Sequence, residues 1–280
     1  MLKPLLFTVT IAAALAPAGL HAQDDEKELG WMDVAELTFV LTAGNASSST
    51  FGLKNTLSHV WDNAVFTLNA GGIRTQASTF TRTATGTLAN PTINKVENSD
   101  VTAENYFLRS RYDRNVSDAV YLFGGAGWER NTFAGFDNRY SVVAGTGRTW
   151  FDSDSRRFKT DVGLTYTSQD DITPDPAIDD SFLGLRGSWD YFKQLSATTA
   201  FDSQLILDEN LNQTDDFRGD FTNSLSVAMS EGLALKTSLQ LLFDNLPSLI
   251  AVPLDGGPDN VLTPLDKVDS IFTVAIVANF

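Results

Sequence analysis

The chemistry available to this sequence is limited by its histidines and cysteines. Beyond residues 1–22 there is one histidine, His59, and the whole chain has no cysteine. A hydrolase would need His59 beside a serine or a carboxylate. Ser58 is adjacent, but adjacent residues of a β-strand point to opposite faces. We therefore predict no catalytic residue and no cofactor, and we interpret His59, close to Trp61, as an amphipathic ring at a membrane interface.

Acidic residues give the chain a formal net charge of −15, which disfavours nucleic acid as a partner. Carboxylates are the ligands that divalent cations prefer, but no acidic cluster here has the spacing of an EF-hand loop. Two interpretations stay open: cations shared with anionic lipopolysaccharide, or solubilising loop charge. The densest cluster is Asp170, Asp171, Asp175, Asp179 and Asp180.

Other charged residues recur at alternate positions of segments that are otherwise apolar. A two-residue period places them on one face of a strand, and if the other face contacts lipid, the charged face lines a barrel interior. A lumen with both signs of charge either closes by pairing across a narrow bore or forms a weakly selective channel. The twelve lumen-lining candidates, six of each sign, are Lys54, Arg109, Arg111, Lys159, Arg186, Lys236, Glu36, Asp161, Asp190, Asp202, Asp220 and Asp269.

The elements that would position these charges are strands. Beyond residues 1–22, no run approaches the roughly 20 apolar residues of a transmembrane helix. Twelve segments of about ten residues instead alternate in hydrophobicity between turn signals. The predicted fold is therefore an all-β transmembrane antiparallel β-barrel. Its strands cover residues 33–42, 50–60, 64–74, 103–112, 119–130, 139–151, 157–167, 182–192, 199–207, 220–229, 233–245 and 268–280.

The fifth of these segments is ambiguous. Tyr121 and Phe123 compete with Val120, Leu122 and Trp128 for the apolar face. Glycines between them permit a bulge that would reconcile the two sets. The sequence has no strand-to-helix context for a nucleotide loop here, so close packing or bulges are predicted for the glycine runs 124–125 and 145–147.

Connections alternate in length, as in outer-membrane barrels. Short gaps follow the even-numbered strands, and the longest gaps are residues 75–102, 168–181, 208–219 and 246–267. An even strand count leaves both termini on one side, which we predict to be periplasmic, with long acidic loops outside. The loops at 75–102 and 246–267 are long enough to fold inward as a plug, or they remain solvated.

Aromatic residues lie near both ends of the predicted strands, as two interfacial girdles would require. The short-turn ends carry Trp61, Tyr112, Phe158, Tyr191, Phe201 and Phe280; the long-loop ends carry Phe51, Tyr140, Tyr166, Phe243 and Phe272. Asn55 and Asn223 interrupt the apolar face without an evident reason.

The two ends of the chain predict export and assembly. Residues 1–22 combine Lys3, an apolar run and helix breakers, which is typical of a cleaved signal peptide, so the barrel domain is residues 23–280. The last strand resembles the closing strand of bacterial outer-membrane barrels, in which a terminal aromatic is part of the assembly signal. Its apolar face consists of Phe272, Val274, Ile276, Ala278 and Phe280. The partners this implies are outer-membrane lipid and lipopolysaccharide, periplasmic chaperones and the barrel assembly machinery.

Several motifs are densest over residues 35–151. They are Ala35-Glu36-Leu37-Thr38-Phe39, Trp61-Asp62, Arg111-Tyr112-Asp113, the run from Gly127 to Asp137, and Gly145-Thr146-Gly147. Together they resemble the YdiY-like salt-induced outer-membrane proteins, the family of domain of unknown function 481, over most of the chain. The resemblance implies a porin-like barrel in a Gram-negative outer membrane and brings no activity, ligand or catalytic residue.

Two functions follow as hypotheses. The first is envelope integrity under osmotic or salt stress, or a narrow pore for small solutes and ions. The second is surface recognition or adhesion through the long loops, and an enzyme ranks third. We expect a lumen that is narrow or occluded, because twelve strands lie between the eight of a filled barrel and the sixteen of an open porin.

Overall fold

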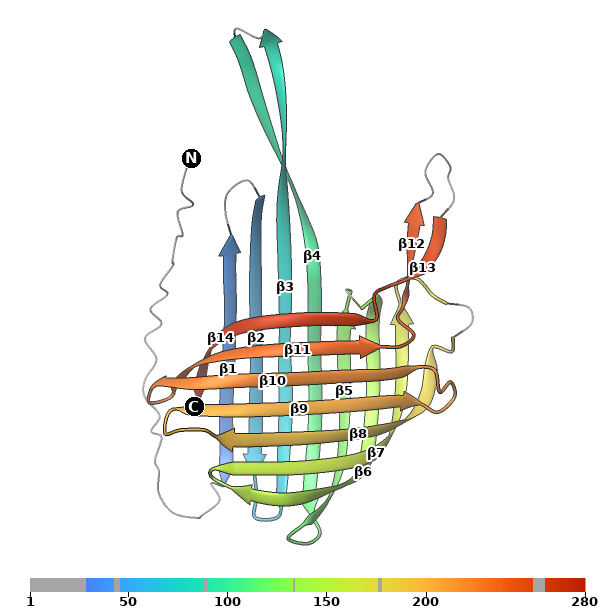
Figure 1. The fold of residues 1–280 in the computed structure, drawn as a ribbon. Helices are drawn as coiled ribbons and strands as arrows, with labels where there is room; N and C mark the ends of the chain where they lie inside the picture. Colours follow the sequence, from blue (N-terminus) through green and yellow to red (C-terminus); the bar gives the residue numbers. More distant parts are fainter. Residues whose placement is uncertain are drawn as a thin grey trace.

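The computed structural model describes residues 29–42, 46–87, 90–132, 134–175, 178–253 and 260–279. Within them, twelve antiparallel strands close into one barrel in the order β1, β14, β11, β10, β9, β8, β7, β6, β5, β4, β3, β2 (Figure 1). The predicted barrel of about twelve strands is confirmed. Its strands are β1 (Gly30–Thr42), β2 (Ala46–Val60), β3 (Ala64–Thr87), β4 (Asn90–Asn115), β5 (Val120–Asn131), β6 (Phe136–Ser153), β7 (Arg156–Asp171), β8 (Ser181–Gln194), β9 (Thr199–Asn210), β10 (Phe217–Ser230), β11 (Leu233–Asp244) and β14 (Val268–Asn279).

The first and last strands close the barrel. Val34 lies opposite Asn279, and Leu37 lies opposite Ile276. Gly30 pairs with Val60, the last residue before a short turn, so β1 begins at the short-turn end where β14 also finishes. The predicted signal peptide and the terminal Phe280 lie outside the described residues. Among the described residues, no helix is long and apolar enough to cross a membrane.

The two faces of the wall follow the alternation in the sequence. Leu239 of β11 lies opposite Phe272 of β14, and both side chains are exposed on the outer face. The preceding residue, Ser238, points inward, where its hydroxyl lies 2.9 Å from that of Ser224. Apolar groups therefore cover the outside of these strands and hydroxyls line the inside, as predicted.

Strand β5 has one clear register. Tyr121 and Phe123 are buried on the inner face, while Leu122 is exposed on the outer face. The bulge considered at the glycines does not form, because pairing with both neighbours is regular there. The irregularity in pairing with β6 instead lies between Glu129 and Asn131.

Inward-facing glycines make room for the two buried rings. A side chain at Gly147 would overlap the Tyr121 ring, and one at Gly145 or Gly163 would press on the Phe123 ring. The predicted close packing at residues 145–147 is therefore observed. The two rings occupy the space that these glycines leave free on the inner face. They thicken this part of the wall toward the lumen.

Gly147→Val tests this packing. We expect it to lower the free energy of unfolding by about 1–3 kcal/mol, because the new side chain must displace the Tyr121 ring. Valine suits a strand, so backbone preference does not account for the loss. The midpoint of urea unfolding in liposomes measures it. Gly187→Val is the control, since nothing lies within 4 Å of an added Cβ there; equal losses in both variants would contradict the packing argument.

Two predicted loops are ordered hairpins. Residues 75–102 were predicted as a loop, but β3 and β4 stay paired up to Thr87 and Asn90, with one irregularity between Thr75 and Gln76. This hairpin projects far beyond the barrel rim (Figure 1), so it is not an inward plug. Within 246–267, β12 (Leu249–Pro253) pairs with β13 (Asn260–Pro264), and this hairpin also points away from the barrel (Figure 1).

Aromatic side chains form runs of contacts around the short-turn end. Neighbouring strands contribute successive rings, so the predicted girdle at this end is a set of contacting residues. His59 is part of it and lies on the outer wall. Ring-centroid separations are 4.5 Å for Trp31 and His59, 4.2 Å for His59 and Trp61, 6.1 Å for Trp61 and Tyr112, 5.8 Å for Phe151 and Phe158, 6.2 Å for Phe158 and Tyr191, and 6.3 Å for Tyr191 and Phe201.

The polar interruption at Asn55 has a partner. Its side-chain amide donates to the Asp33 carboxylate at 2.6 Å, also on the outer wall. The register predicted for this strand is thus correct, and the two polar groups satisfy one another. Asn223 lies opposite Leu239 and Ser203.

Candidate functional site in the barrel interior

All twelve lumen-lining candidates lie on the inner face by register. Directly opposed pairs illustrate this: Glu36 faces Lys54, and Lys159 faces Asp190. Several of them also contact strands that are not their neighbours in the sheet. These contacts join side chains that strand register places on the inner face.

Glu36 joins three strands. Its carboxylate lies 3.0 Å from Lys236 Nζ on β11 and 3.5 Å from Lys54 Nζ on β2. Strand β14 separates β1 from β11 in the wall, so the longer-range contact runs along the inner face. One acid thus compensates two bases.

Arg111 and Asp161 form the other long-range tie. Arg111 Nη2 on β4 lies 2.7 Å from Asp161 Oδ2 on β7, with β5 and β6 between them in the wall. Asp161 also accepts hydrogen bonds from Ser188 at 2.5 Å and from Tyr121 at 3.4 Å. The Arg111 guanidinium lies 4.0 Å from the centre of the Phe123 ring. Asp161 is only 7% exposed, so this network occupies the interior rather than a water-filled space.

Other candidates form local pairs. Arg109 lies 3.0 Å from Glu129, Arg186 forms two hydrogen bonds to Asp208, Lys159 lies 3.4 Å from Asp152, and Asp190 lies 3.1 Å from Arg157. Every basic candidate therefore has an acid within reach.

Three acidic candidates differ from these. Within the described ranges, Asp202, Asp220 and Asp269 have no ion-pair partner. Asp220 accepts hydrogen bonds from Gln240 at 2.9 and 3.0 Å. The three residues lie on β9, β10 and β14, on one side of the barrel. Pairing thus leaves an excess of negative charge on that side of the interior.

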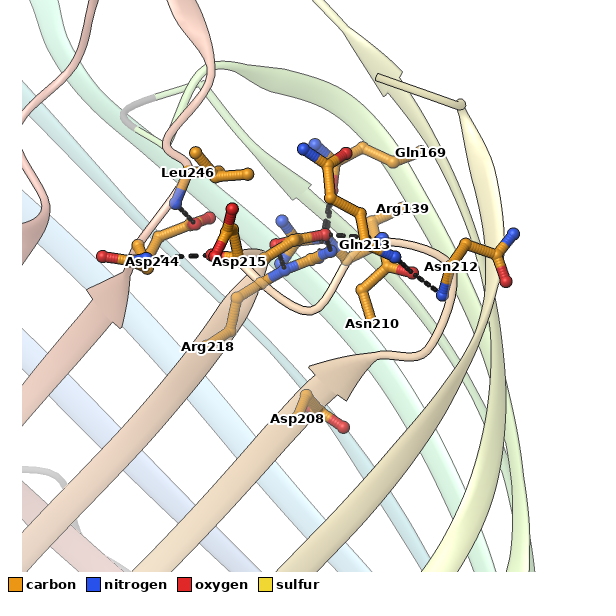
Figure 2. Close-up of polar contacts among 12 residues, drawn as sticks. Arg139, Gln169, Asp208, Asn210, Asn212, Gln213, Asp215, Arg218, Asp244 and Leu246 are labelled. Carbon is orange, nitrogen blue, oxygen red and sulfur yellow. Dashed lines mark hydrogen bonds and ion pairs between the residues drawn. The ribbon is translucent and has the colours of Figure 1, made fainter. Parts of the chain in front are cut away.

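A further cluster, which we call the mouth cluster, lies at the long-loop end and consists of Arg139, Gln169, Asp216, Arg218 and Asp244. Figure 2 shows Arg139, Gln169, Arg218 and Asp244 gathered near the loop that follows β9. Arg218 holds Asp216 through two hydrogen bonds of 3.0 and 2.7 Å, and Arg139 donates to Gln169 at 2.7 Å. Asp216 is only 5% exposed.

The mouth cluster is sealed by the last loop and by aromatic rings. Ser248 donates to Asp171 at 2.8 Å, which attaches the loop after β11 to β7. Arg139 stacks on Phe136 and Arg218 on Phe182. A pocket of about 30 Å³ beside the cluster has room for a water molecule. The cluster and the last loop therefore narrow the mouth on the side of β7 to β11.

Sequence reasoning missed the mouth cluster, although a signal for two members was present. Arg218 and Asp244 extend the inward period of the candidates Asp220 and Lys236, and the predicted strand at 220–229 began too late to include Arg218. Arg139 begins the predicted strand 139–151, for which the sequence analysis named no lumen-lining residue. Asp216 lies in a loop, where periodicity gives no direction.

Elsewhere the interior is open to water. Arg109 and Lys54 point inward yet are 45% and 43% exposed, although each has an ion-pair partner. The side of β2 to β5 therefore contains solvent, while the Arg111 network and the mouth cluster narrow the passage.

Four of the five acidic loop candidates, Asp171, Asp175, Asp179 and Asp180, line the small pocket beside the mouth cluster. Asp170 and Asp171 belong to the end of β7, and Asp171 accepts hydrogen bonds from Gln169 and Ser248. In the part of the chain that the structure describes, no three histidine, cysteine or acidic side chains come together as a metal-binding group. His59 is on the outer wall, away from the interior charges.

Comparisons with known proteins concern the family and the barrel architecture. The model of a family described as protein of unknown function, DUF481, matches residues 35–249. No curated protein matches the chain.

Solved structures with a similar architecture are outer-membrane barrels. The translocator domain of the autotransporter NalP from Neisseria meningitidis is 13% identical, with 91% of this chain and 90% of that chain covered and a TM-score of 0.46. The NanC porin is 13% identical, with 88% and 98% covered and a TM-score of 0.44. The COG4313 outer-membrane channel from Pseudomonas putida F1 is 11% identical, with 91% and 97% covered and a TM-score of 0.44.

Proposed function

This chain belongs to the DUF481 family, and from that premise we propose that it is an outer-membrane β-barrel forming a narrow channel for ions and small solutes. The observation that carries the proposal is the water-exposed charge on the inner face, at Arg109 and Lys54. A structural plug would bury these groups. Twelve strands suit a bore narrower than that of a general porin.

The outer surface supports placement in a membrane. Leucine, valine and aromatic side chains cover the outside of the strands, and aromatic contacts mark the short-turn end. With the predicted signal peptide and closing strand, this favours export and assembly into the outer membrane with the short turns in the periplasm. Outer-membrane lipid, lipopolysaccharide, chaperones and the assembly machinery are the proposed partners.

Single-channel recording tests the proposal directly. The refolded protein in a planar bilayer should give discrete, reproducible openings with a conductance well below that of a sixteen-stranded porin. A barrel that is demonstrably folded but electrically silent would refute the channel, and would move the role to envelope integrity or to the surface.

Ion preference is a more specific consequence. Because Asp202, Asp220 and Asp269 lack basic partners, we expect the channel to prefer cations. Replacing all three with asparagine should lower the cation-to-anion permeability ratio severalfold, as measured from reversal potentials in a salt gradient. Replacing the three exposed loop carboxylates Asp170, Asp179 and Asp180 with asparagine removes the same charge and is the control. If the loop variant changes selectivity as much as the lumen variant, the interior acids do not set it.

Surface recognition is the second candidate, and the β3–β4 hairpin favours it. This hairpin extends well beyond the barrel rim (Figure 1) and exposes Ile93, Val96 and Val101. A hairpin that only connected two strands would not need this length. Loss of surface binding with unchanged conductance on shortening residues 78–99 would support this role.

A further inference from the structure

A hollow of about 620 Å³ lies on the outer wall over β3, away from the lumen. Except for Gly71, its residues come from alternate positions of β2, β3 and β4, which register places on the outer face. Its volume is in the range of ligand sites. It is lined by Ser49, Phe51, Leu53, Asn55, Ala70, Gly71, Gly72, Arg74, Gln76 and Tyr106.

The hollow exists because small residues follow one another along β3. Ala70 and Gly72 form its floor, while Phe51 and Leu53 rise on one side and Tyr106 on the other. The Tyr106 ring packs directly over Gly72. Larger side chains at Ala70 and Gly72 would fill this space. The small residues therefore make the wall concave and mainly apolar here.

One end of the hollow is cationic. Arg74 is exposed, and among the described residues it has no ion-pair partner. Glu104 lies opposite Arg74 in register, but no ion pair joins the two side chains. Arg130, the next outward base beyond Tyr106, is held by Asp137 at 2.7 Å. Arg74 is thus the guanidinium left available at this site.

The depth of Arg74 matches a lipid headgroup. Arg74 pairs in register with Phe51, one of the aromatic residues of the long-loop end, while Gly72 and Ala70 lie successively closer to the middle of the wall. An outer-leaflet lipid has the same polarity, with its phosphate at the interface and its chains directed inward. Guanidinium groups bind phosphate in a bidentate manner.

We propose that this hollow binds one anionic, phosphate-bearing lipid of the outer leaflet, of the lipopolysaccharide class, with Arg74 on the phosphate and an acyl chain over Ala70, beside the Tyr106 ring that covers Gly72. The inference rests on the proposed membrane placement but not on channel activity. It explains why an unpaired arginine and a glycine-floored hollow occur together on a lipid-facing wall.

Native mass spectrometry of the refolded full chain tests the site, with lipid A and with phosphatidylcholine as separate probes. Wild type should retain one lipid A, and Arg74→Gln should weaken that binding about tenfold. Ala70→Phe should abolish it by filling the floor. Arg130→Gln and Ala144→Phe, also on the outer face, are controls that should bind as wild type does.

The outcomes separate the site from the channel. Unchanged lipid A binding in both Arg74→Gln and Ala70→Phe would overturn the proposal, as would equal retention of phosphatidylcholine. Displacement of lipid A by millimolar inorganic phosphate would indicate a free-anion site and would also overturn it. Conductance and heat-modifiable gel mobility are recorded for every variant, so a folded, conducting barrel without lipid selectivity rejects the lipid site alone.

Discussion

Replacing Leu239 with arginine is expected to prevent most of the protein from assembling into a membrane. Leu239 is 43% exposed on the outer wall, near the centre of β11 and between Phe272 and Asn223. Arginine at the bilayer midplane of a barrel costs roughly 2–4 kcal/mol. A cost of that size lowers the equilibrium constant for folding by a factor between about thirty and several hundred.

The folded fraction is measured by gel mobility after dilution from urea into liposomes. Ser238→Lys is the matched control, because Ser238 is the adjacent residue and points into the lumen, where its hydroxyl faces Ser224. We expect this variant to assemble nearly as well as wild type, with a small cost for the lost hydroxyl contact. Equal assembly of the two variants would mean that the outer and inner faces are misassigned, or that the barrel does not lie in a membrane.

The contrast between these neighbours shows what alternation can predict. In β11 the outer positions are almost all apolar and the inner positions are mainly polar, so a period of two gives both the strand and its faces. In β5 both faces are apolar, so the period alone could not show which face points into the lumen. Tyr121 and Phe123 are inside because glycines on β6 and β7 accommodate their rings, and that fit depends on strands that are distant in sequence.

The β3–β4 hairpin was missed for a different reason. Thirteen of the 28 residues at 75–102 are threonine, asparagine or serine, and the segment has no apolar period that would indicate a strand. Pairing nevertheless continues, because the wall below holds the two strands in register and each further pair extends an existing ladder. Composition predicted a loop where the backbone hydrogen bonds favour a ribbon.

For the interior, the sequence could supply the residues but not their partners. The two-residue alternation within each strand was enough to assign all twelve candidates to the inner face, because it depends only on neighbouring residues of the sequence. The partner of Arg111 lies 50 residues away on a strand that is not its neighbour. Such a contact depends on barrel curvature and side-chain length, which neither spacing nor charge count contains.

That contact gives the second large prediction. Asp161→Ala should lower the free energy of unfolding by about 3 kcal/mol, near the low end of the range for breaking a buried pair. The low end applies because Asp113 still lies 2.8 Å from Arg111 and compensates part of its charge. Ser188 and Tyr121 lose their acceptor as well. Urea unfolding in liposomes measures the loss.

Asp152→Ala provides the comparison, because Asp152 pairs with Lys159 at 3.4 Å but is 53% exposed. Exposed pairs contribute at most about 1 kcal/mol, so this variant should unfold almost as wild type does. If the two variants lose equal stability, the Arg111 network does not tie β4 to β7.

The Arg111 network also narrows the passage, and conductance measures this second role. The Asp161→Ala channel, if it folds, should conduct more than wild type because the side chains that narrow the passage are no longer held together. A destabilised barrel with unchanged conductance would instead place the narrowest point at the mouth cluster, where Arg218 and Asp216 narrow the long-loop end of the passage.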